Sequence, residues 1–291
     1  MSILVGILPA LFWGVTPIVT TKIGGKPVQQ LTGTTYGTLM IALILVFIFH
    51  PVITANDFIW CFLAGVSWAL GQFMQYYSFT KMDVSTAMPI FTGLQLIGTP
   101  IIGVLFLNEW ASTNSKVIGT ICIIALFIGI RFTSIQDKHD KKKTNARDRR
   151  NGMICLIFGS FGYILCDTLP RVPNATGLSG ILPQAIGEVI TALIVSLIIH
   201  PHHYGKFLTE RDTVMNTACG WLSGSGTFSY LISSKLNGVA TGFPLTQLNA
   251  VVATIGGIVF LHEHKSRREM LYTIIGLILI IISAFVIGHV K

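Results

Sequence analysis

Two acidic residues lie inside stretches of the sequence that are otherwise nearly free of charge. Glu188 falls about ten residues into the apolar stretch 178–199, and Asp167 falls near the end of the stretch 152–170, four residues before Arg171. A charged side chain at the centre of a bilayer costs at least about 2.5–3.5 kcal/mol, so a carboxyl group at that depth usually has a function. We expect Glu188 to be a proton-coupling group or a substrate contact, and Asp167 to be a second candidate for proton coupling. The structural alternatives are a protonated Glu188 bonded to a neighbouring helix and an Asp167–Arg171 pair at the membrane surface.

Uncharged polar side chains recur at helical spacing in the same kind of stretch. Gln72, Gln75 and Tyr76 fall at i, i+3 and i+4, and Gln184 falls one turn before Glu188; residues so spaced share one helix face. Amide groups both donate and accept hydrogen bonds, as hydroxyl groups do. We therefore expect a neutral, polyhydroxylated ligand. The candidate contacts are Trp13, Gln72, Gln75, Gln95, Gln184, Gln247 and Asn249.

Aromatic and small residues add to this expectation. Trp68 and Trp221, like Trp13, offer flat apolar faces to a ring-shaped ligand. A simpler interpretation of each Gln or Thr is that it joins two helices, at about 0.6 kcal/mol per hydrogen bond; the whole set favours a polar cavity. The glycine pairs Gly33–Gly37 and Gly220–Gly224 have the GxxxG spacing that lets helices approach closely, and we expect them to serve packing.

The elements that would position these side chains are long apolar helices. Hydrophobic residues make up 52% of the 291 residues and charged residues 11%, against about 25% charged in soluble domains. A bilayer core about 30 Å thick needs about 20 helical residues, and backbone groups within it must be paired, which favours helices. We therefore predict an all-α polytopic membrane protein with ten transmembrane helices. The predicted spans are 3–21, 32–50, 57–79, 86–107, 116–133, 152–170, 178–199, 212–234, 240–261 and 270–289.

The segment Gln136–Arg150, with the sequence QDKHDKKKTNARDRR, is the one long stretch suited to bulk water. Short cytoplasmic loops carry an excess of Lys and Arg. If this segment is cytoplasmic and five spans precede it, 16 of the 20 Lys and Arg residues lie inside and 4 lie outside. We therefore predict that both termini lie outside and that the central loop lies in the cytoplasm.

An internal repeat divides the chain. A shift of 154 residues pairs Gln30 with Gln184, Tyr76 with Tyr230, and several further polar residues. The other pairs that carry weight are Lys81 with Lys235, Glu109 with Glu263, and, one residue out of step, Pro89 with Pro244. A unit of five helices is odd in number, so its second copy is inverted, and substrates of inverted-repeat transporters bind near the midplane between the copies. We predict repeats at residues 1–135 and 151–291 around the basic loop 136–150.

Other classes of function lack their sequence signals. The net charge of +8 belongs to short basic loops, and no nucleic-acid-binding motif accompanies it, so we expect no nucleic-acid partner. The five cysteines form no CxxC pair. The sequence also contains no catalytic metal-ligand motif such as HExxH, no P-loop and no GxSxG motif. We expect no metal, no cofactor and no enzyme activity. Since no Lys or Arg precedes Lys22, residues 3–20 are expected to be a retained span and not a signal peptide.

Several segments carry a resemblance to a known family. They are ILVGILPALFWGVTPIVTTKIGG (Ile3–Gly25), QQLTGTTYGTL (Gln29–Leu39), WALGQFMQYYSF (Trp68–Phe79), STAMPIFTGLQLIGTPIIGVLFLNEW (Ser85–Trp110) and LPQAIGEVI (Leu182–Ile190). These segments resemble the glucose/ribose porter family of the drug/metabolite transporter superfamily of bacterial ten-helix carriers. The likeness covers nearly the whole chain and is strongest toward ribose uptake proteins.

The resemblance implies a proton-linked or facilitative sugar permease of the plasma membrane that takes up ribose, with glucose as the alternative. It also implies that the first four helices of each repeat line the cavity, whereas the fifth and tenth are peripheral. Export of metabolites or drugs, as elsewhere in the superfamily, is a second transport hypothesis. A membrane receptor or assembly factor that moves nothing is the hypothesis from a different class. The expected partners are the sugar, H⁺ and the lipid bilayer, and a homodimer is possible.

Overall fold

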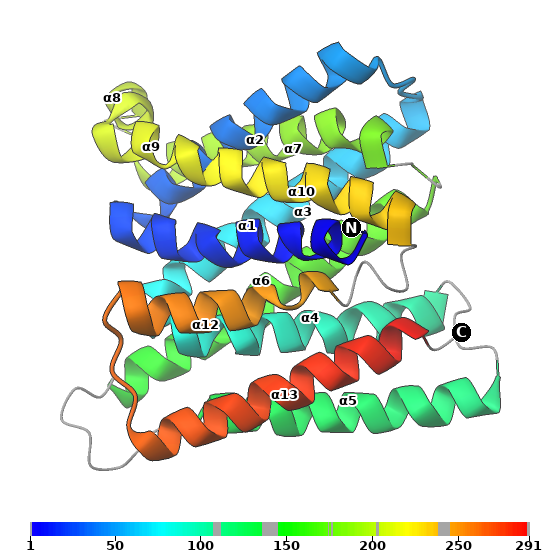
Figure 1. Cartoon of the computed structure of the whole chain (residues 1–291). Helices are drawn as coiled ribbons and strands as arrows, with labels where there is room; N and C mark the ends of the chain where they lie inside the picture. Colours follow the sequence, from blue (N-terminus) through cyan, green and yellow to red (C-terminus); the bar gives the residue numbers. More distant parts are fainter. Residues whose placement is uncertain are drawn as a thin grey trace.

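The computed structural model describes residues 2–106, 112–135, 145–173, 175, 177–201, 204–237 and 245–289, and every regular element in these ranges is a helix. The polypeptide runs back and forth as a bundle (Figure 1). Its elements are α1 (Ser2–Ile23), α2 (Pro27–Phe49), α3 (Ala55–Phe79), α4 (Val84–Phe106), α5 (Thr113–Thr133), α6 (Ala146–Thr168), the short 3₁₀ turn η1 (Leu169–Arg171), α7 (Gly177–Ile199), α8 (Tyr204–Thr209), α9 (Arg211–Met215), α10 (Thr217–Asn237), α12 (Asn249–Phe260) and α13 (Arg267–His289).

Each predicted span overlaps a helix, and three boundaries need correction. The span predicted at 212–234 is divided, because α9 ends at Met215 and α10 begins at Thr217. The span predicted at 240–261 is shorter among the described residues, where α12 begins at Asn249. Helix α2 begins five residues early, at Pro27, because proline is well tolerated at the first helical position, where its missing N–H would be unpaired in any case.

The basic segment is partly helical. Helix α6 begins at Ala146, inside the segment predicted as loop, and Asn145 caps it by accepting a hydrogen bond from the Arg147 backbone N–H. Asp148 in the first turn pairs with Lys81 at 3.1 Å, and an acidic residue there also suits the positive end of the helix dipole. The remainder of the predicted loop, residues 136–144, lies outside the described residues.

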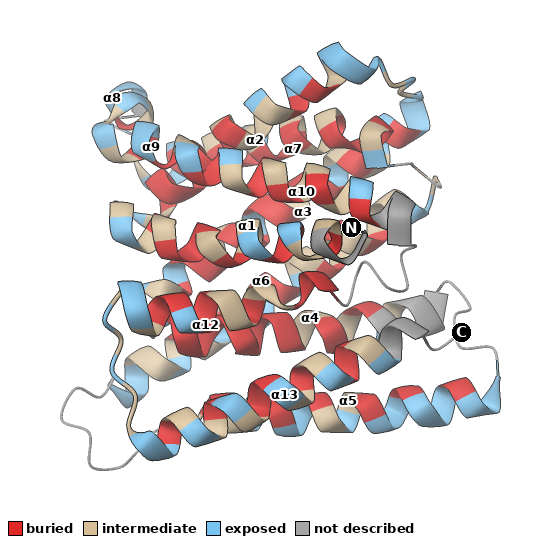
Figure 2. Ribbon diagram, in the orientation of Figure 1, coloured by how far each residue is buried: buried red, intermediate tan, exposed pale blue. Residues whose placement is uncertain are grey.

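The outer surfaces of the helices are apolar. Phe47, Phe158 and Ile198 are 79%, 67% and 73% exposed, whereas buried residues lie on the faces that the helices turn toward one another (Figure 2). Seven helices in the described part of the chain are long and apolar enough to cross a membrane. Large exposed apolar faces are unfavourable in water, so the protein is an integral membrane protein.

Helices that precede the basic segment pack against helices that follow it. Helix α1 contacts α10 and α12, and α6 contacts α3 and α4. Helix α7 contacts α2 and α3, while α2 also contacts α10 and α4 also contacts α12. Helices α5 and α13 pair with each other along one side of the bundle (Figure 1). The interior is therefore enclosed by the other long helices.

Close contact between α2 and α10 depends on glycine. A Cβ atom built on Gly37 would lie 2.7 Å from the Gly220 Cα and 2.2 Å from the Thr217 carbonyl oxygen, and one built on Gly220 would lie 2.0 Å from the Thr34 carbonyl oxygen. No side chain fits at those distances. The predicted packing role of these two glycines is confirmed.

Candidate functional site

Glu188 lies in the interior, between α7 and α2. Its side chain is 3% exposed. One carboxylate oxygen accepts a hydrogen bond from Gln184 Nε2 at 3.0 Å, and the other accepts one from Thr38 Oγ1 at 2.8 Å. Both donors are neutral, so neither balances a negative charge. The site can therefore hold the carboxyl group in place, but these two donors provide no positive charge that would stabilise its ionised form.

A second polar group lies on α3, where Gln72 and Gln75 face α6 and α4. Gln72 Nε2 donates to Gln75 Oε1 at 2.8 Å, and Gln75 Nε2 points to Met88 Sδ at 3.5 Å. The hydroxyl group of Tyr163, on α6, donates to Gln72 Oε1. Both glutamines are at least 94% buried, with exposures of 5% and 6%. We call Gln72, Gln75 and Tyr163 the amide–phenol cluster.

Aromatic rings surround the amide–phenol cluster. The Tyr163 ring lies 5.8 Å from the Trp68 ring and 4.9 Å, edge to face, from the Phe91 ring. Gly71 makes room for it, because a Cβ atom there would lie 2.9 Å from the Tyr163 ring. Flat apolar faces beside amide and hydroxyl groups are the usual composition of a site for a small polar ligand.

The polar interior continues from this cluster toward α2. Tyr76 is 1% exposed, and its hydroxyl group and Thr34 Oγ1 are 2.9 Å apart. Thr34 lies one helical turn before Thr38, the α2 residue that donates to Glu188. Thr32 Oγ1 and Ser196 Oγ, 2.9 Å apart, form a further polar contact between α2 and α7. The structure thus brings Gln72, Gln75, Gln184 and Glu188 into one polar interior.

The other candidates lie at different interfaces. Trp13, on α1, donates to the Ser223 carbonyl oxygen on α10 at 3.1 Å and packs on Tyr230 with 6.0 Å between ring centroids. Thr92, on α4, donates to Asn249 Oδ1 at 3.3 Å, and Gln247 Nε2 donates to Thr246 Oγ1 at 3.1 Å.

Three remaining positions are less central. Gln95 is half-buried on α4. Asp167 is half-buried near the end of α6, and Arg171 lies in the adjoining turn η1; a pair between them stays a prediction. Trp221 is 53% exposed, so it does not supply an interior face for a ligand.

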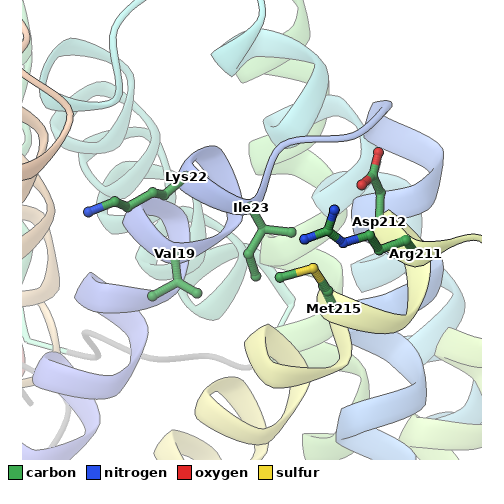
Figure 3. Close-up of a pocket in the computed structure, with 6 residues that line it drawn as sticks. All are labelled: Val19, Lys22, Ile23, Arg211, Asp212 and Met215. Atoms are coloured by element: carbon green, nitrogen blue, oxygen red, sulfur yellow. The ribbon is translucent and has the colours of Figure 1, made fainter.

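A pocket of about 450 Å³ lies at one end of the bundle, where α1 ends and α9 begins. Its lining residues are Val19, Lys22, Ile23, Arg211, Asp212 and Met215. Arg211 and Met215 point toward Ile23, whereas Lys22 points away from them (Figure 3). This pocket is open to the surface and is distant in sequence from the amide–phenol cluster, whose groups are packed against one another in this conformation.

Sequence reasoning did not select Tyr163 or Thr38. Tyr163 lies one helical turn before Asp167 in an apolar stretch, and Thr38 lies one turn after Thr34. In both cases the signal was a polar residue one turn from another on the same helix face. The partners themselves are on other helices, so a single-helix pattern could not identify them.

Comparisons with known proteins agree with this architecture. The sugar transport protein family matches residues 4–290. A Listeria monocytogenes protein named for sugar uptake is 40% identical over 100% of both chains. A Latilactobacillus sakei protein named for ribose uptake is 37% identical over 100% of this chain and 99% of its own. The glucose uptake protein GlcU of Bacillus subtilis is 36% identical over the same shares.

A solved crystal structure shares the fold. It aligns with a TM-score of 0.62 at 12% sequence identity, and the alignment covers 98% of this chain and 95% of that chain. The family match along almost the whole sequence, together with relatives up to 40% identical over their full length, shows that the chain belongs to the sugar transport protein family.

Proposed function

We propose that this protein takes up a sugar across the plasma membrane as a secondary transporter, and that ribose is its substrate, with glucose as the alternative. The proposal is carried by one observation, a hydrogen-bonded interior of neutral polar side chains inside a bundle whose outer faces are apolar. Relatives named for ribose and for glucose uptake support it.

The amide–phenol cluster provides the contacts for the sugar. Gln72, Gln75 and Tyr163 use one another as hydrogen-bond partners in this conformation. Amide and phenol groups can exchange those partners for sugar hydroxyl groups, which also donate and accept. Trp68 and Phe91, beside Tyr163, would cover the apolar face of the sugar ring. No ionic contact is needed for a neutral sugar.

Glu188 provides proton coupling. A carboxylate in the bilayer interior without a cation carries a large desolvation cost, and a bound proton removes it. Its neutral partners Gln184 and Thr38 can contact either form. Thr38, the partner of Glu188, lies one helical turn from Thr34, the partner of Tyr76 on the helix that carries Gln72. Proton binding and sugar binding would therefore influence each other through α2 and α3. Uptake is then driven by the proton gradient.

Alternating access between two inverted five-helix repeats is the proposed mechanism. Ten transmembrane helices would arise from residues 1–135 and 151–291. Helix contacts support the repeat: α1 packs on α10 and α12 as α6 packs on α3 and α4, and α2 packs on α10 as α7 packs on α3. If each helix is replaced by its counterpart in the other repeat (α1 by α6, α2 by α7, α3 by α10 and α4 by α12), each of these contacts becomes another of them. Both termini lie at one end of the bundle (Figure 1), which is consistent with both termini outside and the basic loop in the cytoplasm.

Flux into proteoliposomes tests the function. Purified protein is reconstituted, and uptake of labelled ribose and labelled glucose is measured with and without an inward proton gradient. We expect saturable ribose uptake that the gradient increases. If neither sugar shows saturable flux under either condition, the proposed function is wrong.

A pair of variants tests the sugar contacts. Tyr163→Phe removes the hydroxyl group that donates to Gln72 but keeps the ring between Trp68 and Phe91. Losing one polar contact to a ligand typically weakens binding by about tenfold, so we expect a rise of that order in KM. Trp221→Phe, at an exposed position on α10, is the control and should leave KM unchanged. Equal KM values for Tyr163→Phe and the unmodified protein would remove Tyr163 from the site.

A further inference from the structure

The start of helix α4 is held by a carboxylate from a distant part of the chain. Glu263, between α12 and α13, accepts hydrogen bonds from the backbone N–H groups of Val84 at 2.7 Å and Ser85 at 2.8 Å. These N–H groups belong to the first two residues of α4, where no partner exists within the helix. A negative charge there is also favoured by the helix dipole. Glu263 thus caps a helix that lies 179 residues away in the sequence.

Neighbouring contacts hold the same turn of α4. Lys265 Nζ donates to Thr86 Oγ1 at 3.2 Å, and Thr254 Oγ1 donates to the Ser85 carbonyl oxygen at 3.4 Å. Val84, Met88 and Ala253 form a buried apolar cluster beside them. The first turn of α4 and the end of α12 are therefore closed on each other by apolar and polar contacts together.

The backbone around Glu263 is shaped for this contact. His262 has a φ angle of 55°, a left-handed conformation that non-glycine residues seldom adopt. The Glu263 N–H then bonds back to the Gly257 carbonyl oxygen at 3.2 Å. A Cβ atom at Gly257 would lie 2.5 Å from Glu263 Oε2, so glycine leaves the space that the carboxylate occupies.

We propose that Glu263 is a positioning residue that clamps α4 to α12 and closes the end of the bundle at which α4 begins. The proposal rests on the proposed transport function, and it adds the step that must occur before a sugar leaves at this end. Helix α4 carries Met88, the contact of Gln75, and Thr92, the contact of Asn249. Release of the clamp would therefore open the end of the bundle and move side chains next to the amide–phenol cluster in one motion.

Accessibility of a cysteine placed behind the clamp tests the proposal. Ser85 is 0% exposed, and Ser85→Cys keeps both the backbone N–H that donates to Glu263 and nearly the same side-chain size. Right-side-out and inside-out membrane vesicles are treated with a hydrophilic maleimide, and labelling of Ser85→Cys is followed by peptide mass spectrometry. Buried Cys122, on α5, is the internal reference, and no sugar is present.

Glu263→Gln is compared with Glu269→Gln, which offers a matched control. Glu269, in the first turn of α13, accepts a hydrogen bond from the N–H of Ser266, the residue just before that helix, at 2.9 Å, and so helps to cap its own helix. We expect Glu263→Gln to raise the labelling rate of Ser85→Cys at least about fivefold, the effect of losing one charge-assisted hydrogen bond. Glu269→Gln should leave the rate unchanged.

Three outcomes would overturn the clamp: an unchanged rate in Glu263→Gln, an equal rise in Glu269→Gln, or an equal rise at Cys122 that indicates general loosening. Because the assay contains no sugar, it is independent of the flux measurement. A closed clamp in a protein without sugar flux would refute the proposed function alone, whereas sugar flux with unchanged labelling would refute the clamp alone.

Discussion

Glu188 and Glu263 are the same side chain in two different surroundings. Glu188 accepts from a neutral amide and a neutral hydroxyl group in the middle of α7, whereas Glu263 accepts from two backbone N–H groups at the start of α4. Burial raises the pKa of the Glu263 carboxyl, and the hydrogen bonds from Ser85 and Val84 act against that shift. Glu263 thus satisfies two backbone N–H groups that have no partner within α4, whereas Glu188 has only side-chain partners, which can be exchanged.

This difference separates two tasks of a transporter. A group whose partners tolerate either protonation state can bind and release a proton during each cycle. A group that satisfies unpaired N–H groups is suited to holding two helices together until the contact is broken as a unit. We infer that the interior acid couples sugar transport to the proton gradient and that the terminal acid determines which conformation is populated.

The largest effect is expected from Glu188→Gln, which keeps the size and hydrogen bonding of the side chain but removes the titrating group. With one proton per sugar, one pH unit of gradient supports about a tenfold accumulation, since it is worth about 1.4 kcal/mol. We expect that accumulation to disappear while sugar exchange across the membrane continues. Asp167→Asn, beside Arg171, is the control and should keep accumulation. Unchanged accumulation in Glu188→Gln would show that Glu188 is structural.

Gly257→Ala should loosen the clamp without changing any charge. The added methyl group would lie 2.5 Å from Glu263 Oε2 and 3.1 Å from the Ser85 nitrogen, so the carboxylate must move. Because a displaced carboxylate keeps part of its contact, we expect about a threefold rise in Ser85→Cys labelling, less than for the loss of a full hydrogen bond. The accumulation ratio should be unchanged. If accumulation fell as far as in Glu188→Gln, the two acids would not have separate tasks.

Thr38→Val tests how firmly Glu188 must be held. The substitution removes the donor at 2.8 Å with little change of shape, and interhelical hydrogen bonds in membranes contribute about 0.6 kcal/mol on average and about 1.7 kcal/mol at most. We expect a loss of that size in the free energy of unfolding. The same free energy corresponds to about a twofold to threefold change in the apparent proton affinity of uptake. Denaturant unfolding and the pH profile of uptake are the two measurements. If neither the free energy of unfolding nor the pH profile of uptake changed, Thr38 would have no role in holding Glu188.

The smallest effect is expected from Lys265→Met, which removes the donor to Thr86. Lys265 supports the clamp from one side, and hydrogen bonds near the surface contribute about 0.5 kcal/mol or less to stability when one charged partner is partly solvated. Labelling of Ser85→Cys should rise by less than about twofold by that estimate. An effect larger than that of Gly257→Ala would place the main holding contact at Lys265 and not at Glu263.

The helices were largely predictable from the sequence, because lipid requires runs of apolar residues about 20 long. Their exact ends were not, since they depend on local chemistry: Pro27 starts α2, and Asn145 starts α6 inside the basic segment. The charged helix α9, with Arg211 and Asp212, is separated from α10 by a turn that the hydropathy pattern did not reveal.

The candidate site was predictable only where its residues share one helix. Gln184 with Glu188, and Gln72 with Gln75, were found by spacing and do form hydrogen bonds with each other. Their partners Thr38 and Tyr163 come from other helices, and only the packing of those helices brings them close. Glu263 was noted solely as a repeat match, because capping of a helix that lies far away in sequence leaves no local pattern.

The central claim is that a sugar crosses the membrane through the interior that contains Gln72, Gln75 and Tyr163. Counterflow tests it most directly, because proteoliposomes loaded with unlabelled ribose accumulate external labelled ribose only if one binding site faces each side in turn. The account predicts a transient overshoot of labelled ribose for the unmodified protein and its loss in Gln72→Leu. No overshoot with ribose or glucose, or an equal overshoot in Gln72→Leu, would contradict it.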